Sequence, residues 1–189
     1  MGRPIPAERS KSGVASSPSV MRTLISWPTL KRPSGFEPPL AVEQGELSSE
    51  PDHLFTFAVL WPYIASASEA YGADAQVLAA IIMQESGWKN WRVHADGTGH
   101  GLLGLDDNGL LPDFERWAGL QVGRGAAAAM IPPKAQIGYG AYQLRRYMDI
   151  YGGAFTAARV WHRGPNLYLD ARGDNYEALM RAHVRTLFG

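Results

Sequence analysis

Hydrophobic residues in most of the chain follow the spacing of helices rather than of strands. The most apolar stretch, residues 54–67, is shorter than the ~20 residues that cross a bilayer and contains Pro62, so we interpret it as a buried helix. A second helix is predicted over residues 75–86, with Asp74 as its N-cap and Gly87 as its left-handed C-cap. Its apolar stripe consists of Val77, Leu78, Ile81 and Ile82.

The second half of the chain predicts further helices. Short helices are expected over residues 113–118, 126–130 and 155–161. A longer helix ends before Gly152, with one apolar face formed by Ile137, Ala141, Leu144, Met148 and Tyr151. The last helix is expected to have Asp174 as its cap. No segment alternates like a strand, so the predicted fold class is mainly α, with at most a small β-hairpin between residues 93 and 105.

The first fifty residues are rich in proline and serine and lack sustained apolar periodicity. We therefore divide the chain into a disordered or extended N-terminal tail at residues 1–50 and one globular domain at residues 51–189. The basic, serine-containing start could also be a targeting segment. It lacks the unbroken apolar run of a secretory signal, however, and its prolines oppose an amphipathic transit helix.

Composition narrows the possible functions. With 189 residues, of which 46% are hydrophobic and 19% charged, the chain has room for one ordinary core. Its 18 basic and 18 acidic side chains balance, so nothing steers a polyanion and nucleic acid is not an expected partner. The absence of cysteine excludes disulfides and a thiol nucleophile. We also expect no metal and no other cofactor, because the sequence has no zinc spacing, P-loop or dinucleotide fingerprint.

Glu85 continues the apolar face of the helix at residues 75–86, because Val77, Ile81 and Glu85 follow one another at intervals of four. Burial would raise the pKa of this carboxyl group, the condition under which it can hold a proton near neutral pH and deliver it to a leaving group. The alternative is that the helix ends here and Glu85 turns to water or pairs with Lys89. Spacing alone leaves both interpretations open.

A glycine-rich stretch follows that helix and would let the backbone approach a ligand closely. Asp96 and Asp106 could orient a water opposite Glu85, as the second carboxylate of an inverting glycosidase does. The same aspartates stand in Asp-Gly and Asp-Asp-Asn-Gly sequences, which are common turn formers. His94 and His100 lack the spacing of metal ligands on a helix, so we expect them to be solvated loop residues.

Five short motifs occur in order along the chain: ADAQVLAAIIMQESG at 73–87, GLLGLD at 101–106, GAYQLRRYMDIYGG at 140–153, ARVWHRG at 158–164 and DNY at 174–176. Together they resemble the soluble lytic transglycosylase and goose-type lysozyme superfamily over about residues 55–189. The resemblance implies a lysozyme-like, α-rich domain. Two departures stand out: the glutamine of the family's second motif is Gly104 here, and its Tyr-Asn pair is Trp161 and His162.

The resemblance also implies roles for individual residues. It places the catalytic acid on Glu85, while the aspartates that hold the hydrolytic water in goose-type members correspond to Asp96 and Asp106. The residues implied in glycan binding are Ser86, Gly101, Leu102, Leu103, Trp161, His162 and Tyr176.

The implied activity is cleavage of the β-1,4 bond between N-acetylmuramic acid and N-acetylglucosamine in peptidoglycan. Hydrolysis is favoured because Asp96 and Asp106 match the water-holding aspartates, and transfer to the muramoyl C6 hydroxyl is the other possible reaction. The alternative, motivated by Gly104 and His162, is a non-catalytic peptidoglycan-binding, chitin-binding or structural wall protein. The expected partner is the peptidoglycan glycan strand. We expect the protein to be a monomer and not to insert stably into a membrane. Since no secretory signal is evident, a phage lysin released through a holin or carried on the virion is favoured.

Overall fold

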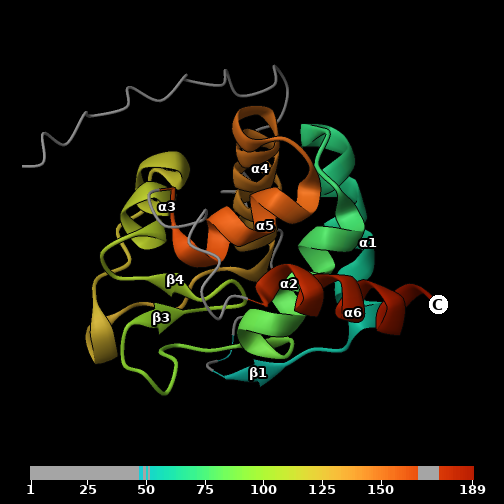
Figure 1. Ribbon diagram of the computed structural model, residues 1–189. Helices are drawn as coiled ribbons and strands as arrows, with labels where there is room; N and C mark the ends of the chain where they lie inside the picture. Colours follow the sequence, from blue (N-terminus) through green and yellow to red (C-terminus); the bar gives the residue numbers. More distant parts are fainter. Residues whose placement is uncertain (1–46, 49, 51, 166–174) are drawn as a thin grey trace, which may run out of the picture. The chain divides into compact units, whose positions relative to one another are not determined.

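The computed structural model describes residues 47–48, 50, 52–165 and 175–189, which include six α-helices and two pairs of short antiparallel strands (Figure 1). In chain order the elements are β1 (His53–Leu54), α1 (Phe57–Tyr71), α2 (Ala75–Ser86), β2 (Lys89–Asn90), β3 (Gly99–His100), β4 (Leu105–Asp106), α3 (Leu110–Ala118), the 3-10 turn η1 (Gly125–Ala127), α4 (Pro133–Tyr151), α5 (Ala154–Arg163) and α6 (Tyr176–Phe188). The mainly α fold class predicted from the sequence is confirmed. The tail predicted at residues 1–50 falls almost wholly outside the described residues, so the division into tail and domain stays a prediction.

Local sequence signals set the bounds of α2. The carboxylate of Asp74 accepts hydrogen bonds from the backbone N–H groups of Gln76 and Val77, at 3.0 Å each, and Gly87 ends the helix with a φ of 59°. A glycine is favoured at this C-cap because a side chain is strained in the left-handed conformation. The predicted apolar stripe is buried, with no member more than 1% exposed. The helix therefore runs through the core and brings Glu85, in its last turn, to the edge of that core.

The predicted hairpin forms from β3 and β4, in which Gly99 pairs with Asp106. A second antiparallel pair, β1 with β2, joins residues far apart in the sequence, and an isolated bridge between Trp91 and Gly101 links the two pairs. Each strand has only two residues, too few for an alternating pattern to be recognised in the sequence. These short strands fix the loops that follow α2.

The helix expected over residues 126–130 is wrong, because the chain forms only the single 3-10 turn η1 there. The run of alanines has good helix propensity, but a few residues cannot offset the cost of helix nucleation. The N–H of Ala129 instead donates to the carbonyl of Val122 at 2.7 Å, which pairs this segment with the loop after α3. At the other end of the domain, the cap predicted at Asp174 lies outside the described residues.

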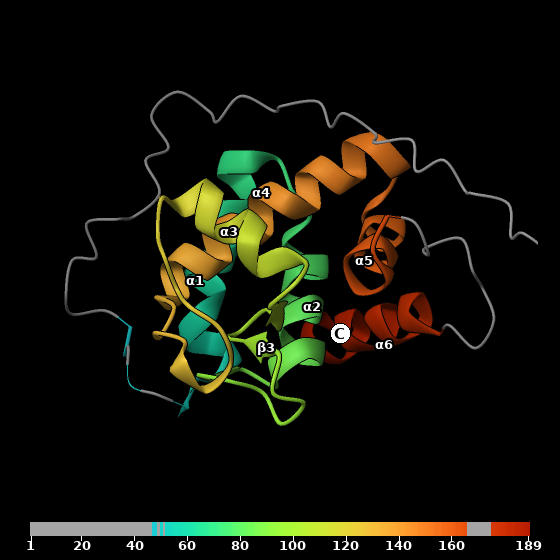
Figure 2. The same ribbon diagram turned by 90° about the vertical axis from the view of Figure 1, so that its left-hand side faces the viewer.

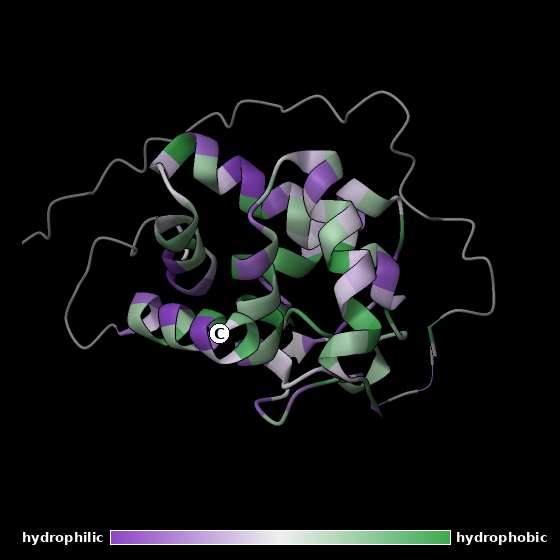
Figure 3. Cartoon of the chain, turned by 90° about the vertical axis from the view of Figure 1, so that its right-hand side faces the viewer, coloured by the Kyte–Doolittle hydropathy of each residue, from purple (hydrophilic) through white to green (hydrophobic). Residues whose placement is uncertain are grey.

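Helix α4 lies at the centre of the helical packing and contacts α1, α3 and α5, while α2 and α6 lie side by side in both views (Figures 1 and 2). Gly140 permits close packing at the centre, because a Cβ there would lie 3.0 Å from Leu78 of α2 and 3.1 Å from Leu103. Helix α6 carries hydrophobic and hydrophilic residues in mixture along its length (Figure 3), and Tyr176 and Met180 are its buried residues. The start of α6 is therefore brought against the end of α2.

The helix predicted over residues 54–67 forms as α1, but it begins only at Phe57, because Leu54 belongs to β1. Leu60 and Ile64 have no exposed surface, whereas Val59 is 46% exposed, so α1 buries one face and is not buried as a whole. In the part of the chain that the structure describes, no helix combines the length and the apolar character needed to cross a membrane.

Candidate active site

Glu85 and Tyr176 meet where α2 ends and α6 begins. The Tyr176 hydroxyl donates a hydrogen bond of 2.5 Å to Oε1 of Glu85. Tyr176 is 3% exposed and Glu85 is half-buried, so the hydrogen bond is largely shielded from water. The sequence left open whether Glu85 faces the protein or turns to water, and in the structure it faces the protein. Lys89, its alternative partner, extends instead over the ring of Trp91, with Nζ 3.6 Å from the centroid.

The surroundings of Glu85 favour its protonated form. Burial raises the pKa of the carboxyl group above its ordinary value of about 4.5, while the hydrogen bond from Tyr176 lowers it in part. Burial is the larger effect, so Glu85 keeps a proton to higher pH than a solvated glutamate does. A carboxylic acid in this state can act as a general acid.

His162 of α5 lies against the other side of this pair. Its imidazole is stacked on the ring of Tyr176, with 4.3 Å between the centroids and 10° between the planes. His162 is itself exposed, so it covers the tyrosine from the solvent side. The structure thus brings together Glu85, Tyr176 and His162, three residues predicted for the site from three separate motifs.

The turn formed by residues 101–104 lines the carboxyl group from the side of the β3–β4 hairpin. Gly104 has a φ of +58°, and a Cβ at this position would lie 3.1 Å from Oε2 of Glu85. The backbone therefore comes close to the acid where a side chain would crowd it. In the sequence Gly104 was notable only as a departure from the family pattern; its contact with Glu85 is visible only in the fold.

The other predicted residues of this turn face the protein interior. Leu102 and Leu103 have no exposed surface, so neither is open to a glycan in this structure, and their roles in glycan binding stay predictions. Gly101 is also buried, and its Cβ would collide with the side chain of Gln136, 2.0 Å from Oε1. The glycine at 101 therefore permits the close approach of another side chain, whereas the sequence had suggested the approach of a ligand.

Ser86 and Trp161 are also engaged with the protein. The Ser86 hydroxyl donates to the carbonyl of Ile82 at 2.9 Å, within α2. Trp161 is 6% exposed and packs near Tyr139, with 6.4 Å between the ring centroids. Little of its ring is available to stack on a sugar. Their roles in glycan binding stay predictions.

Asp96 is held in the turn that precedes β3. Its Oδ1 accepts hydrogen bonds from the backbone N–H groups of Thr98 at 2.9 Å and Gly99 at 3.1 Å. These hydrogen bonds lower the pKa of Asp96 below its ordinary value, although the side chain is exposed. The geometry is that of an Asx turn.

Asp106 is similarly engaged at the end of the hairpin. Oδ1 accepts from the N–H of Asn108 and Oδ2 from the N–H of Leu110, both at 3.2 Å. Since Leu110 is the first residue of α3, Asp106 holds the chain as it enters that helix. Both aspartates thus have the turn-forming contacts that the sequence offered as the alternative to catalysis, and their catalytic roles stay predictions.

The interpretation of the loop histidines as solvated is wrong for His100, which has no exposed surface. Its Nδ1 lies 2.6 Å from the carbonyl oxygen of Arg92 and its Nε2 lies 2.8 Å from Oδ1 of Asp107. The half-buried His94 has Nε2 at 2.8 Å from the carbonyl oxygen of Gly101. Both rings therefore stabilise the loop. The local sequence around the two histidines does not predict these contacts.

Asn90 and Gln136 are buried residues of this region that the sequence analysis did not select. The Nε2 group of Gln136 donates to Oδ1 of Asn90 at 2.8 Å, and its Oε1 accepts from the backbone N–H of Leu102 at 2.6 Å. A glutamine between alanine and isoleucine in a run of otherwise small or hydrophobic residues, AQIGYGA, was the available signal. Within the described residues, no group of three or more histidine, aspartate or glutamate side chains is placed to hold a metal ion.

An α-helical domain with a half-buried glutamic acid at the end of a core helix is an arrangement suited to glycosidic bond cleavage, which requires a carboxylic acid that retains its proton. Comparison with protein families identifies the class: the transglycosylase SLT domain matches residues 62–183, and the chain belongs to this family. Members of the family are lytic transglycosylases that act on peptidoglycan. Comparison with curated proteins and with solved structures gave no match.

Proposed function

We propose that this protein cleaves the β-1,4 bond between N-acetylmuramic acid and N-acetylglucosamine in peptidoglycan, with Glu85 as the general acid. The observation that supports the proposal most is the half-buried Glu85 at the end of α2, with the Tyr176 hydroxyl 2.5 Å from Oε1, in a chain that belongs to the SLT family. Burial raises the pKa of Glu85, so the carboxyl group can carry the proton that the leaving oxygen needs. Tyr176 fixes the orientation of that group.

The proposed reaction is lytic transglycosylation. Glu85 donates its proton to the glycosidic oxygen, and the bond from that oxygen to the muramoyl C1 breaks. The muramoyl C6 hydroxyl oxygen then bonds to C1, and its proton returns to the Glu85 carboxylate. A 1,6-anhydro product results, without consumption of water. No second carboxylate is needed, which is consistent with the engagement of Asp96 and Asp106 by backbone N–H groups.

Hydrolysis is the competing outcome. It would require Asp96 or Asp106 to orient a water on the opposite face of the sugar. A third outcome, a protein that binds the glycan without cleaving it, is motivated by Gly104 and His162 in place of the family's glutamine and asparagine.

The test is mass spectrometry of the fragments released from purified peptidoglycan by the wild type, by Glu85→Gln, and by Glu69→Gln as a control that alters an exposed glutamate of α1. We expect 1,6-anhydro fragments from the wild type and from Glu69→Gln and none from Glu85→Gln, because an amide N–H is far too weakly acidic to protonate the leaving oxygen. Fragments with reducing muramic ends would instead indicate hydrolysis. Binding to insoluble peptidoglycan without any released fragment would overturn the proposed activity.

A further inference from the structure

Gln136, near the start of α4, is hydrogen-bonded to the segment just before that helix and to two segments that are distant in the sequence. Its Oε1 accepts from the N–H of Leu102 at 2.6 Å, while Nε2 donates to Oδ1 of Asn90 at 2.8 Å and to the carbonyl oxygen of Ile131 at 2.9 Å. Asn90 completes the cluster through Nδ2, which donates to the same carbonyl of Ile131 at 3.3 Å. Both amide side chains are fully buried.

The orientation of the Gln136 amide is determined by its partners. A backbone N–H can only donate and a backbone carbonyl can only accept, so Oε1 must face Leu102 and Nε2 must face Ile131. Both N–H bonds of Nε2 are used. A buried amide with its polar atoms satisfied costs little to keep, whereas loss of one partner leaves the remaining groups unpaired and costs about 1–3 kcal/mol for each. Gln136 therefore holds the N–H of Leu102 at a defined position.

Leu102 belongs to the turn at residues 101–104, which lines Glu85. Leu102 stands two residues before Gly104, whose added Cβ would meet Oε2 of Glu85 at 3.1 Å. Leu103, between them, packs into the space left by Gly140 of α4. Two contacts from α4 thus hold the turn close to the carboxyl group of Glu85: the packing of Leu103 at Gly140 and the buried hydrogen bond from Leu102 to Gln136.

We propose that Gln136 is a positioning residue of the active site: through Leu102 it holds the turn at residues 101–104 against Glu85 and so keeps water away from the carboxyl group. The inference rests on the proposed role of Glu85 as the acid. When the turn loosens, water reaches Oε2, and the desolvation that favours the protonated form decreases. The acid is then less able to retain its proton as the pH rises.

Among the described residues, titratable side chains of two other elements lie at Glu85. They are Tyr176 of α6, which donates to Oε1, and His162 of α5, stacked on Tyr176. The Gln136 cluster is formed with Asn90, Leu102 and Ile131, on other segments than these two side chains. A change in the titration of Glu85 on substitution of Gln136 therefore reports on the turn.

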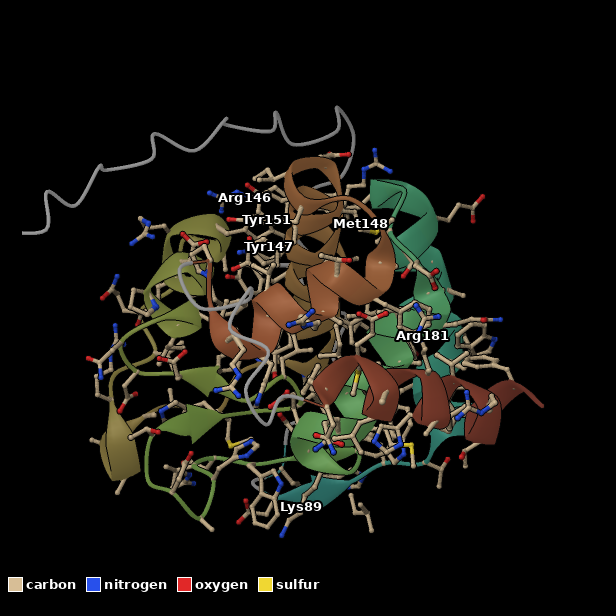
Figure 4. The ribbon with its side chains drawn as sticks, in the orientation of Figure 1. Lys89, Arg146, Tyr147, Met148, Tyr151 and Arg181 are labelled. Atoms are coloured by element: carbon tan, nitrogen blue, oxygen red, sulfur yellow. The ribbon has the colours of Figure 1, made fainter. Side chains whose placement is uncertain are left out.

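The test compares Gln136→Met with Gln143→Met. Both glutamines are buried on α4, but Gln143 accepts from Arg146 at 3.3 Å, and Arg146 lies in the C-terminal half of α4, beside Tyr147 and Tyr151 (Figure 4). Methionine keeps the length of the side chain and removes its hydrogen bonds. The pKa of Glu85 is measured in each free protein by NMR titration of the 13C-labelled side-chain carboxyl group, together with hydrogen exchange at the Leu102 N–H.

For Gln136→Met we expect the pKa of Glu85 to fall toward its ordinary value, faster exchange at Leu102, and a loss of kcat of about ten- to a hundredfold from misplacement of the turn. The alkaline limb of the pH–activity profile should move to lower pH. Gln143→Met should lose stability without any of these changes. If Gln136→Met does not fold, Asn90→Ala, which keeps the bond to Leu102 but removes one partner of Gln136, should show the same changes at smaller amplitude.

An unchanged or raised pKa of Glu85 in folded Gln136→Met or Asn90→Ala would overturn the proposal and leave Gln136 a purely structural residue. The NMR titration does not depend on catalysis. A wild type that releases no glycan fragment would therefore refute the proposed function, while the titration would still decide whether Gln136 controls the burial of Glu85.

Discussion

The Tyr176 hydroxyl donates a 2.5 Å hydrogen bond to Oε1 of Glu85, across 91 positions of sequence. The contact joins the last turn of α2 to the first residue of α6. It exists because these two helices lie side by side over the same core (Figure 1). The orientation of the proposed acid therefore depends on the docking of the helix that ends the chain.

Substitution of Tyr176 by phenylalanine should raise the pKa of Glu85 further. The hydrogen bond from Tyr176 stabilises the carboxylate, so its loss leaves burial unopposed. We expect the alkaline limb of the pH–activity profile to move to higher pH, opposite to the shift expected for Gln136→Met. Tyr142→Phe, in a ring that packs against Tyr71 and Trp117, is the control and should leave the limb in place. A limb that stays fixed in Tyr176→Phe would contradict this prediction.

Glu85→Gln should stabilise the protein at alkaline pH while it abolishes activity. The pKa of Glu85 is raised in the folded state, so ionisation costs more there than in the unfolded chain. The wild type therefore loses stability as the pH rises through the folded-state pKa, and the neutral amide does not. Thermal unfolding should show similar Tm values for the two proteins at about pH 4 and a higher Tm for Glu85→Gln at about pH 8, by roughly 2–4 °C for each kcal/mol gained. A Tm difference that is the same at both pH values would argue against a raised pKa.

A comparison of Gly104→Ala with Gly119→Ala distinguishes the effect of backbone strain from the effect of crowding Glu85. Both glycines have left-handed φ values, +58° and +68°, so alanine should cost each variant roughly 1–2 kcal/mol of stability. A Cβ at Gly119 meets nothing within 4 Å, whereas one at Gly104 lies 3.1 Å from Oε2 of Glu85. We expect kcat to fall by about tenfold or more for Gly104→Ala only, because small displacements of a reacting group are costly. Equal kcat values in the two variants would show that the turn does not constrain the acid.

Glu115→Gln should destabilise the protein most at neutral pH. The Glu115 carboxylate accepts from both terminal nitrogens of Arg124, at 2.9 and 2.8 Å, and from the N–H of Val122 at 2.8 Å. The hydrogen bond from Arg124 is the largest effect that lowers the pKa of Glu115 to about 2. Because the folded-state pKa is lowered, the contribution of Glu115 is complete above the ordinary pKa of about 4.5 and is lost as the pH falls toward 2.

Urea unfolding at pH 7, 4 and 3 checks this expectation. Glu115→Gln should lose roughly 1–3 kcal/mol at pH 7, with a smaller difference from the wild type at pH 3. Asp149→Asn is the control, since Asp149 is exposed, its partner Arg145 is an i, i+4 neighbour and such surface pairs contribute little. A deficit of Glu115→Gln that does not decrease between pH 4 and 3 would contradict the lowered pKa.

Much of the framework was predictable from the sequence because it depends on interactions over a few residues. Helix α2 has the bounds, the Asp74 cap and the left-handed Gly87 that local hydrogen bonding specifies. Periodicity likewise placed Glu85 on the face that turns toward the core. The helix predicted at residues 126–130 is wrong for a related reason: alanine propensity favoured it, but the actual conformation comes from pairing of Ala129 with Val122.

The sequence by itself determined most of the helices and the mainly α class, since caps and periodicity act within single segments, and its family motifs singled out Glu85 as the candidate acid. Only the tertiary structure decided what surrounds that acid. The hydroxyl of Tyr176, the backbone at Gly104 and the amide of Gln136 come from α6, a turn and α4, and they meet around α2 only through packing of the core. No local pattern specifies contacts over such separations, because they depend on how close each helix can approach its neighbours. Small residues such as Gly140 set those distances, and in a linear sequence a glycine does not reveal which side chain fills its space.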